Sequence, residues 1–359
     1  MLMRALRNWS LPFGSLAIGL VSSALLVAQN SASPARPGLP RGKVEKVSVH
    51  GKSLEGNLEG DPADRDVFIY LPPSYSGANR RYPAVYLLHG YGFTGQGWMS
   101  FTNVAAAADK DAAGGMREMI LVIPDSYTFY NGSMYSNSAT TGYWEDFIAE
   151  DLVRYVDSHY RTIPDRMSRG LGGHSMGGYG TMRIGMKRPD VFGSLYAMSS
   201  CCLGDASPIA ELTAAFETVK SPQDAKGAAQ AQGGARGYTL GPLARAAAWS
   251  PNPKNPPFYF DLPTKGGILQ PDILAKWAAN DPLATIDQNI SQLKKYRAIA
   301  ADVGLQDPLL VSNRAMEDLL TRSSVPHSFE TYEGDHLNKV AERVETKVLP
   351  FFSKNLTFK

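Results

Sequence analysis

A serine flanked by glycines is the feature of this sequence most able to do chemistry. It is Ser175, in the segment Gly173-His174-Ser175-Met176-Gly177, which fits the pattern G-x-S-x-G. A strand-like run precedes the segment and a helix-like run follows it, which is the setting of a nucleophile elbow. Glycines on either side leave room for the sharp turn, because side chains there would collide with neighbouring elements. We therefore expect Ser175 to be a nucleophile at a helix N-terminus, where backbone N–H groups favour negative charge.

Such a serine needs a histidine base, and the histidine needs a carboxylate that orients it. With this elbow the chain order is serine, acid, histidine, and only His327 and His336 follow Ser175. We favour His336, which comes after a strand-like run and a Gly-Asp turn, over His327, which opens that run. For the acid we favour Asp307, on a loop past the preceding strand, and keep Asp302, near the end of that strand, as the alternative.

The oxyanion that forms during acyl transfer needs backbone N–H donors. Met176 is expected to supply one, because it directly follows the nucleophile. The second is expected from the loop His89-Gly90-Tyr91-Gly92 that follows an apolar run, and we assign it to the Tyr91 N–H. The imidazoles of His89 and His174 are expected to be structural.

The elements that must position these residues alternate between strands and helices. Strand-like runs are expected at 43–51, 66–75, 83–90, 119–125, 168–175, 193–200, 298–304 and 327–334. Helices are expected at 144–160, 176–188, 285–300, 312–323 and 338–353. This alternation predicts an α/β fold, with a mostly parallel central sheet and helices on both faces. Residues 203–280 interrupt the rhythm, and we interpret them as an insertion over one end of the sheet that could act as a lid.

Composition excludes several other classes of protein. The 359 residues are 43% hydrophobic and 19% charged, with 36 Lys and Arg against 34 Asp and Glu, which excludes a disordered chain and a multispan membrane protein. A net charge of +2 does not resemble a nucleic-acid binder, so no nucleic-acid partner is expected. Metal-ligand spacings are absent, and neither a metal nor a cofactor is expected. The two cysteines, Cys201 and Cys202, are interpreted as buried thiols rather than as a vicinal disulfide.

The first residues have the layout of a targeting segment. Arg4 and Arg7 precede an apolar stretch, Leu11 to Val27, and Ala28 is a plausible cleavage position. This layout predicts a signal peptide over 1–28 in preference to an uncleaved anchor. Residues 29–42 contain three prolines and are interpreted as a disordered linker before a single domain at 43–359. We therefore expect a secreted or periplasmic protein with no stable membrane partner.

The runs PAVYLLHGYGFTGQGW, LVIPD, GGHSMGGYGTMRIGMKRPDVFGS, VGLQD and EGDH resemble the putative-esterase family of α/β-hydrolases. This family includes esterase D-like S-formylglutathione hydrolases, feruloyl and acetyl-xylan esterases, and mycolyl-transferring enzymes. The resemblance covers about residues 44 to 355 and is weakest across 203–280. It implies an α/β-hydrolase fold, with Ser175 as nucleophile, Asp307 as acid, His336 as base, and the Met176 and Tyr91 N–H groups as oxyanion hole.

We expect a secreted serine esterase acting through an acyl-enzyme on a small-molecule or polysaccharide-linked ester. Acyl transfer to an alcohol and a non-catalytic binding protein on the same fold are the alternatives. Residues 126–144 hold many aromatic side chains among small polar ones, a composition that suits short-chain or aromatic acyl groups. The expected substrate contacts are Trp144, Tyr143, Tyr130 and Trp98.

Overall fold

An eight-stranded sheet organises the part of the chain that the structure, a computed structural model, describes: residues 41–204, 207–231 and 240–359. All of these residues belong to one compact unit, Pro40–Lys359. The expected signal peptide, and the expected linker except for its last two residues, lie outside them. Within the described ranges, no helix has both the length and the apolar character that a membrane span requires.

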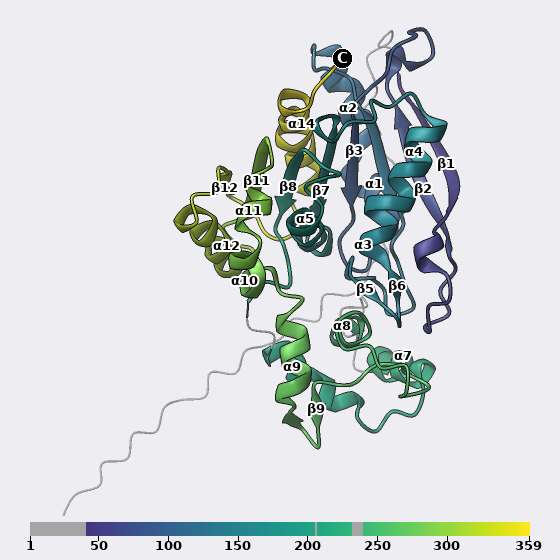
Figure 1. The fold of residues 1–359 in the computed structure, drawn as a ribbon, viewed down its shortest axis with the longest axis vertical. Helices are drawn as coiled ribbons and strands as arrows, with labels where there is room; N and C mark the ends of the chain where they lie inside the picture. The colour runs from purple at the N-terminus through teal and green to yellow at the C-terminus, as the bar shows by residue number, and fades with distance from the viewer. Residues whose placement is uncertain (1–40, 205–206, 232–239) are drawn as a thin grey trace, which may run out of the picture. The chain divides into compact units, whose positions relative to one another are not determined.

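The sheet is mostly parallel, as the sequence predicts. Its strand order is β1-β2-β4-β3-β7-β8-β11-β12, in which β1 and β2 run antiparallel to their neighbours and the others run parallel (Figure 1). The strands are β1 (Lys43–His50), β2 (Asp64–Leu71), β3 (Ala84–Leu88), β4 (Ile120–Pro124), β7 (Arg169–His174), β8 (Ser194–Met198), β11 (Ala298–Gly304) and β12 (Ser328–Tyr332). Because parallel strands end at the same edge, the loops after β3, β7, β8, β11 and β12 converge there.

Alternate side chains of each strand feed two separate cores. In β3, Tyr86 and Leu88 belong to one hydrophobic cluster, and Val85 and Leu87 belong to the other. This period of two follows from the pleat of a strand and requires helices on both faces. The first face is covered by α3 (Trp144–Asp146), α4 (Leu152–His159), α5 (Met176–Lys187) and α12 (Leu310–Arg322). The second is covered by α1 (Gly95–Thr102), α2 (Val104–Ala113), α13 (Val340–Arg343) and α14 (Leu349–Asn355).

One expected helix is broken. In place of a continuous helix over 285–300, the chain forms α10 (Pro282–Thr285), a short 3-10 turn and α11 (Ile290–Leu293), and then enters β11. The side chain of Asp281 caps α10 by accepting a hydrogen bond from the Leu283 N–H. The Asp281 cap and a proline at the first helical positions favour the start of a short helix here. The last residues of the expected helix, from Ala298 on, belong to β11 instead.

The insertion folds into short elements instead of an irregular stretch. It contains α6 (Ser207–Glu211), α7 (Pro222–Ala231), α8 (Gly241–Trp249), the hairpin β9 (Thr264–Lys265) and β10 (Ile268–Leu269), and α9 (Pro271–Ala278). It packs on a second small hairpin, β5 (Asn137–Ser138) and β6 (Gly142–Tyr143). The Ser138 hydroxyl donates to the Ala247 carbonyl, and the Trp249 Nε1–H donates to the Ser136 hydroxyl. These bonds tie α8 to the loop region that follows β4 (Figure 1).

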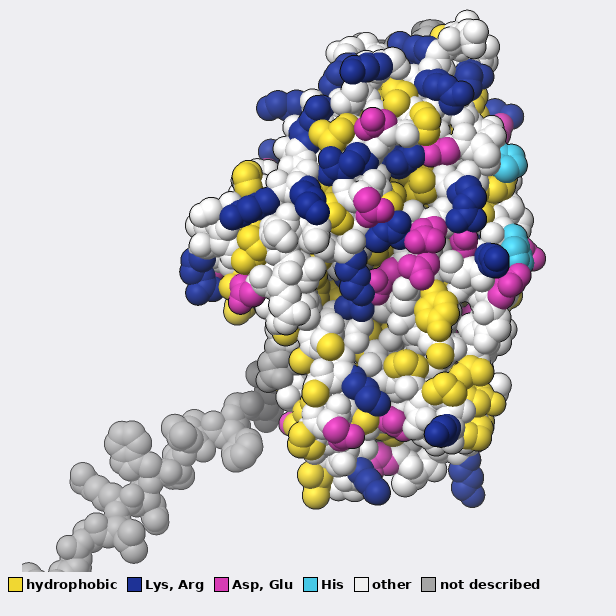
Figure 2. Space-filling model, viewed as in Figure 1, with side chains coloured by type: hydrophobic (Ala, Val, Ile, Leu, Met, Phe, Trp, Pro, Cys, Tyr) yellow, Lys and Arg dark blue, Asp and Glu magenta, His cyan; other side chains and the backbone are white. Residues whose placement is uncertain are grey.

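Basic and acidic side chains are interspersed over the face shown in Figure 2.

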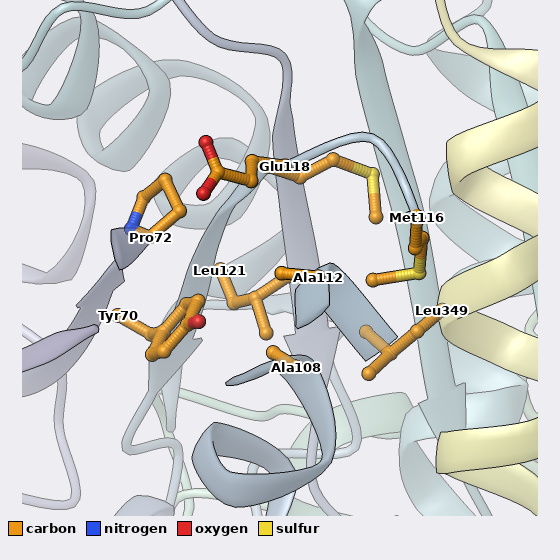
Figure 3. A pocket seen from close by; sticks show the side chains of 9 residues that line it. Tyr70, Pro72, Ala108, Ala112, Met116, Glu118, Leu121 and Leu349 are labelled. Atoms are coloured by element: carbon orange, nitrogen blue, oxygen red, sulfur yellow. The ribbon is translucent and has the colours of Figure 1, made fainter. Parts of the chain in front are cut away.

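A small hollow of about 10 Å³ lies between α2, β2, β4 and α14, lined by residues such as Tyr70, Ala108, Leu121 and Leu349 (Figure 3). Its volume suits a single water molecule at most. No residue of the predicted catalytic set lines it, so it has no part in the site described next.

Candidate active site

Ser175 occupies a sharp turn between β7 and α5. Its backbone has φ +58° and ψ −113°, a conformation that L-residues rarely adopt outside functional turns. A Cβ on Gly177 would lie 2.1 Å from the Leu88 carbonyl oxygen, and one on Gly173 would lie 2.5 Å from the Gly177 backbone. Only glycine fits at both positions. The two glycines of the motif therefore allow α5 to start directly against β3 and β7, with Ser175 at its first turn.

Three side chains form a continuous hydrogen-bonded chain at the carboxyl edge of the sheet. The Ser175 Oγ lies 2.9 Å from Nε2 of His336, and Nδ1 of His336 lies 2.8 Å from Oδ2 of Asp307. Because a carboxylate only accepts, Nδ1 carries the proton and Nε2 is left to accept from the serine hydroxyl. The structure thus brings together the three residues that the sequence singled out, from the ends of β7, β11 and β12.

The environment of Asp307 keeps its carboxylate ionised. Burial raises the pKa of the Asp307 carboxyl, but hydrogen bonds from His336 and from the Leu309 N–H outweigh burial and hold the pKa below its usual value. Its side chain has no exposed area, whereas that of His336 is 23% exposed. The buried Asp307 carboxylate therefore orients the His336 imidazole from the protein interior, and the imidazole is reachable from solvent.

The two alternatives lie elsewhere. Asp302 is fully buried, and its carboxylate pairs with Arg343 and accepts a hydrogen bond from the Tyr196 hydroxyl at 2.8 Å. His327 places Nδ1 2.8 Å from the Val325 carbonyl oxygen, at the start of β12. Neither side chain forms a hydrogen bond with the Ser175–His336–Asp307 chain.

The loop after β3 lies against Ser175. A Cβ on Gly90 would be 3.4 Å from the Ser175 Cβ, so this loop approaches the serine closely. The His89 ring fixes the loop, because Nδ1 donates to the Gly90 carbonyl at 2.9 Å and Nε2 accepts from the Ser126 N–H at 2.9 Å. The Tyr135 hydroxyl also donates to the His89 carbonyl at 3.2 Å. His89 therefore has a structural role, which matches its sequence-based interpretation.

The two expected oxyanion donors come from neighbouring elements. Met176 is the first residue of α5, where helix amides lack an acceptor within the helix. Tyr91 lies beside it: a Cβ on Gly132 would be 2.7 Å from the Met176 Sδ and 2.8 Å from the Tyr91 ring. The Tyr91 hydroxyl donates to the Tyr130 carbonyl at 2.8 Å, which fixes the position of the ring.

Three of the four expected substrate contacts are buried in the protein core. The exposed fractions of Trp98, Tyr130 and Trp144 are 0%, 1% and 1%. Trp98 packs in the cluster under α1 and α2, and the Trp144 Nε1–H donates to the Thr141 carbonyl. The expectation that these three side chains contact the substrate is therefore corrected, because a substrate cannot reach them. Tyr143 is 48% exposed, at the β5–β6 hairpin.

The cysteine pair also differs from its interpretation. Cys201 and Cys202 form a vicinal disulfide directly after β8, not two thiols. The Cys201 N–H donates to the Ser175 carbonyl at 3.1 Å, so the pair is attached to the backbone of Ser175. Cys202 has φ +64°, and this turn brings the two sulfur atoms together. Residue types alone did not reveal this backbone conformation.

Sequence reasoning also missed Arg245 of α8, whose Nη2 lies 3.3 Å from the Cys202 Sγ. Its place in the insertion, far from the motifs, gave no signal. A hollow of about 400 Å³ opens beside His336 and is lined by Phe101, Pro308 and Leu337 among others. Phe101 is 37% exposed and packs on Phe93 with ring centroids 5.3 Å apart. Among the described residues, no cluster of three or more His, Cys, Asp or Glu could hold a metal ion.

The chain is similar to several known proteins. The model of the family described as "Putative esterase" matches residues 62–340. An endo-1,4-beta-xylanase/feruloyl esterase of Xylanibacter ruminicola is 29% identical over 164 residues, which cover 44% of this chain and 22% of that protein. An S-formylglutathione hydrolase of Rattus norvegicus is 27% identical over 153 residues, covering 37% of this chain and 51% of that protein. The chain therefore spans about half or less of the length of these curated relatives.

Solved structures show the same fold. A ferulic acid esterase superposes with a TM-score of 0.62 and 21% identity, covering 88% of this chain and 99% of that one. FphF, a fluorophosphonate-binding serine hydrolase of Staphylococcus aureus, superposes with a TM-score of 0.58 and 19% identity, covering 87% of this chain and 99% of that one. At these identities the likeness establishes the α/β-hydrolase architecture.

Proposed function

This chain belongs to the putative-esterase family, and on that premise we propose that it is a serine carboxylic-ester hydrolase with Ser175, His336 and Asp307 as its triad. The observation that carries the proposal is the hydrogen-bonded chain from Ser175 Oγ through the His336 imidazole to Asp307. A serine on a strained elbow, next to an imidazole oriented by a buried carboxylate, is the arrangement that nucleophilic acyl transfer requires.

The proposed reaction has two halves. Ser175 Oγ attacks the ester carbonyl while His336 Nε2 takes its proton, and the Met176 and Tyr91 N–H groups stabilise the oxyanion. His336 then returns the proton to the leaving alkoxide, which departs as an alcohol and leaves an acyl-enzyme. A water molecule, activated by the same imidazole, attacks the acyl-enzyme and releases the acid. Asp307 stays ionised throughout and stabilises the imidazolium.

We propose short-chain or aromatic acyl esters as substrates. The hollow beside His336 is lined by the exposed Phe101 ring, and an aromatic wall suits a small or flat group. One relative's name includes feruloyl esterase, and another's is S-formylglutathione hydrolase. The test compares kcat/KM for acetyl, butyryl, feruloyl and palmitoyl esters of one leaving group. A tenfold preference for the palmitoyl ester would overturn the proposed substrate class.

The catalytic proposal is tested by pre-steady-state kinetics. Mixing with p-nitrophenyl acetate should release a burst of p-nitrophenol, because this activated ester is expected to acylate the enzyme faster than the acyl-enzyme is hydrolysed. Ser175→Ala should abolish the burst while its circular dichroism spectrum stays unchanged. A full burst from this variant would overturn the assignment of the nucleophile.

We also propose that the protein is exported after removal of residues 1 to about 28. N-terminal sequencing of the exported protein should begin near Gln29 or Ser33. An intact Met1 in the membrane fraction would instead favour an uncleaved anchor.

A further inference from the structure

The guanidinium of Arg245, on α8, lies beside the part of the site that contains Ser175. Arg245 Nη2 contacts the Cys202 Sγ at 3.3 Å, and the adjoining Cys201 N–H donates to the Ser175 carbonyl. The guanidinium carbon lies 5.7 Å from the centre of the Trp249 ring, and the Tyr91 and Tyr179 phenols are within its electrostatic reach. Arg245 thus lies among groups that border Ser175 and the expected oxyanion loop.

Among the described residues, Arg245 has no carboxylate partner of the kind that the buried arginines have. Each of the four arginines that are buried in the described ranges pairs with a carboxylate: Arg65 with Asp125, Arg169 with Asp157, Arg183 with Glu145, and Arg343 with Asp302. Arg245 is mostly enclosed but still reached by solvent, and no carboxylate among residues 41–204, 207–231 and 240–359 lies within 4 Å of it. Burial lowers its pKa to about 10, so it stays charged at neutral pH.

An enclosed charge without a counter-charge is costly, and a structural role here would be served as well by an uncharged side chain. Among the described residues, only one of the five guanidinium N–H donors has an acceptor, the Cys202 sulfur, which is a weak one. The remaining donors form the planar fork that binds a carboxylate with two parallel hydrogen bonds. The missing partner is therefore best supplied by a ligand.

We propose that Arg245 is a specificity residue that binds a carboxylate carried by the ester substrate. This inference rests on the proposed esterase function and adds the charge of the substrate to it. The carboxylate can belong to the acyl part or to the alcohol part of the ester, and the two sources are separated by the choice of probe.

Two matched pairs of esters test the inference. For the acyl part, 4-nitrophenyl glutarate monoester is compared with the isosteric neutral 4-nitrophenyl 5-methylhexanoate. For the alcohol part, 4-acetoxybenzoate is compared with 4-acetoxybenzamide. In one of the pairs, the wild-type protein should hydrolyse the anionic ester with a kcat/KM about tenfold or more above that of its neutral partner, as expected for a charge-assisted pair of hydrogen bonds.

The same ratio is then measured in variants. Arg245→Met should lower the ratio about tenfold or more, and Arg245→Lys should lower it less, because an ammonium keeps the charge but not the fork. Arg154→Met is the matched control: Arg154 is an exposed arginine of α4, 70% exposed, and its loss should leave the ratio unchanged. A ratio within twofold of the wild type in Arg245→Met would overturn the inference.

The failure of this inference can be told apart from failure of the esterase proposal. Hydrolysis that depends on Ser175 but shows no preference for either anionic ester overturns the role of Arg245 alone. Absence of Ser175-dependent hydrolysis of all four esters overturns both. If Arg245→Met does not fold, as judged by circular dichroism, the wild-type ratios and the Arg245→Lys ratio decide the matter.

Discussion

Nε2 of His174 lies 2.9 Å from the backbone carbonyl oxygen of His336. The residue before the proposed nucleophile, Ser175, therefore holds the backbone of the residue proposed as its base. Because a carbonyl only accepts, the His174 Nε2 carries a proton, and burial lowers the pKa of His174 to about 3, so this ring stays neutral. His174, at the first x position of the G-x-S-x-G motif, thus links Ser175, its neighbour in the chain, to the backbone of His336.

Replacing His174 should impair the chemical step more than substrate binding. His174→Phe keeps an aromatic ring but removes the donor to the His336 carbonyl, so we expect kcat to fall about tenfold while KM changes less than threefold. Steady-state kinetics on p-nitrophenyl acetate measures both values. His174→Gln, which can still donate, should recover part of kcat. Equal losses of kcat in the two variants would contradict this positioning role.

The two aspartates near the end of β11 should behave differently. Asp307→Asn should lower kcat roughly 10³-fold or more with little change in stability, since the His336 imidazole loses its orienting carboxylate. Asp302→Asn should instead cost about 3 kcal/mol in the free energy of unfolding, because it leaves the buried Arg343 charge undercompensated. Kinetics and urea denaturation on both variants separate these effects. A larger loss of kcat in folded Asp302→Asn would reverse the assignment.

The pH profile of kcat/KM should report one ionisation on its acidic side. The pKa of Asp307 is held below its usual value, so its carboxylate remains ionised as the pH falls through the range where an imidazole titrates. The pKa of His174 is lowered to about 3 and burial also lowers that of His89, so neither ring gains a proton there. Since neither this carboxylate nor these two rings gain a proton in that range, the limiting slope of log kcat/KM against pH should be no greater than one. A slope of two would contradict this account.

Loss of the vicinal disulfide should have little effect on global stability. The disulfide joins adjacent residues, so the entropy that it removes from the unfolded chain stabilises the folded state by only about 1 kcal/mol. We expect the Cys201→Ala/Cys202→Ala variant to unfold within about 3 °C of the wild type in a thermal scan. A thiol titration of the unfolded, unreduced protein should find no free thiol in the wild type. A fall of 10 °C or more would show that the pair stabilises far more than its own turn.

The sequence predicted those parts of the site that local chemistry and chain order control. The glycines around Ser175 could be interpreted because their steric reason is local, and His336 and Asp307 because each follows a strand whose end lies at a known edge of the sheet. The burial of Trp98 and Trp144 could not be predicted, because an aromatic side chain has the same pattern in a core and in a pocket. The position of Arg245 beside the site depends on how a long insertion packs, and no local sequence pattern predicts that packing.

The measurement that tests the account most directly is mass spectrometry of the protein after reaction with diethyl p-nitrophenyl phosphate. This reagent phosphorylates an activated serine, and the product resists hydrolysis. The account predicts a single diethyl phosphoryl adduct per chain, located on Ser175 by peptide mapping, and no adduct on His336→Ala within the same time. An adduct on another residue, or unchanged labelling of Ser175→Ala, would contradict it.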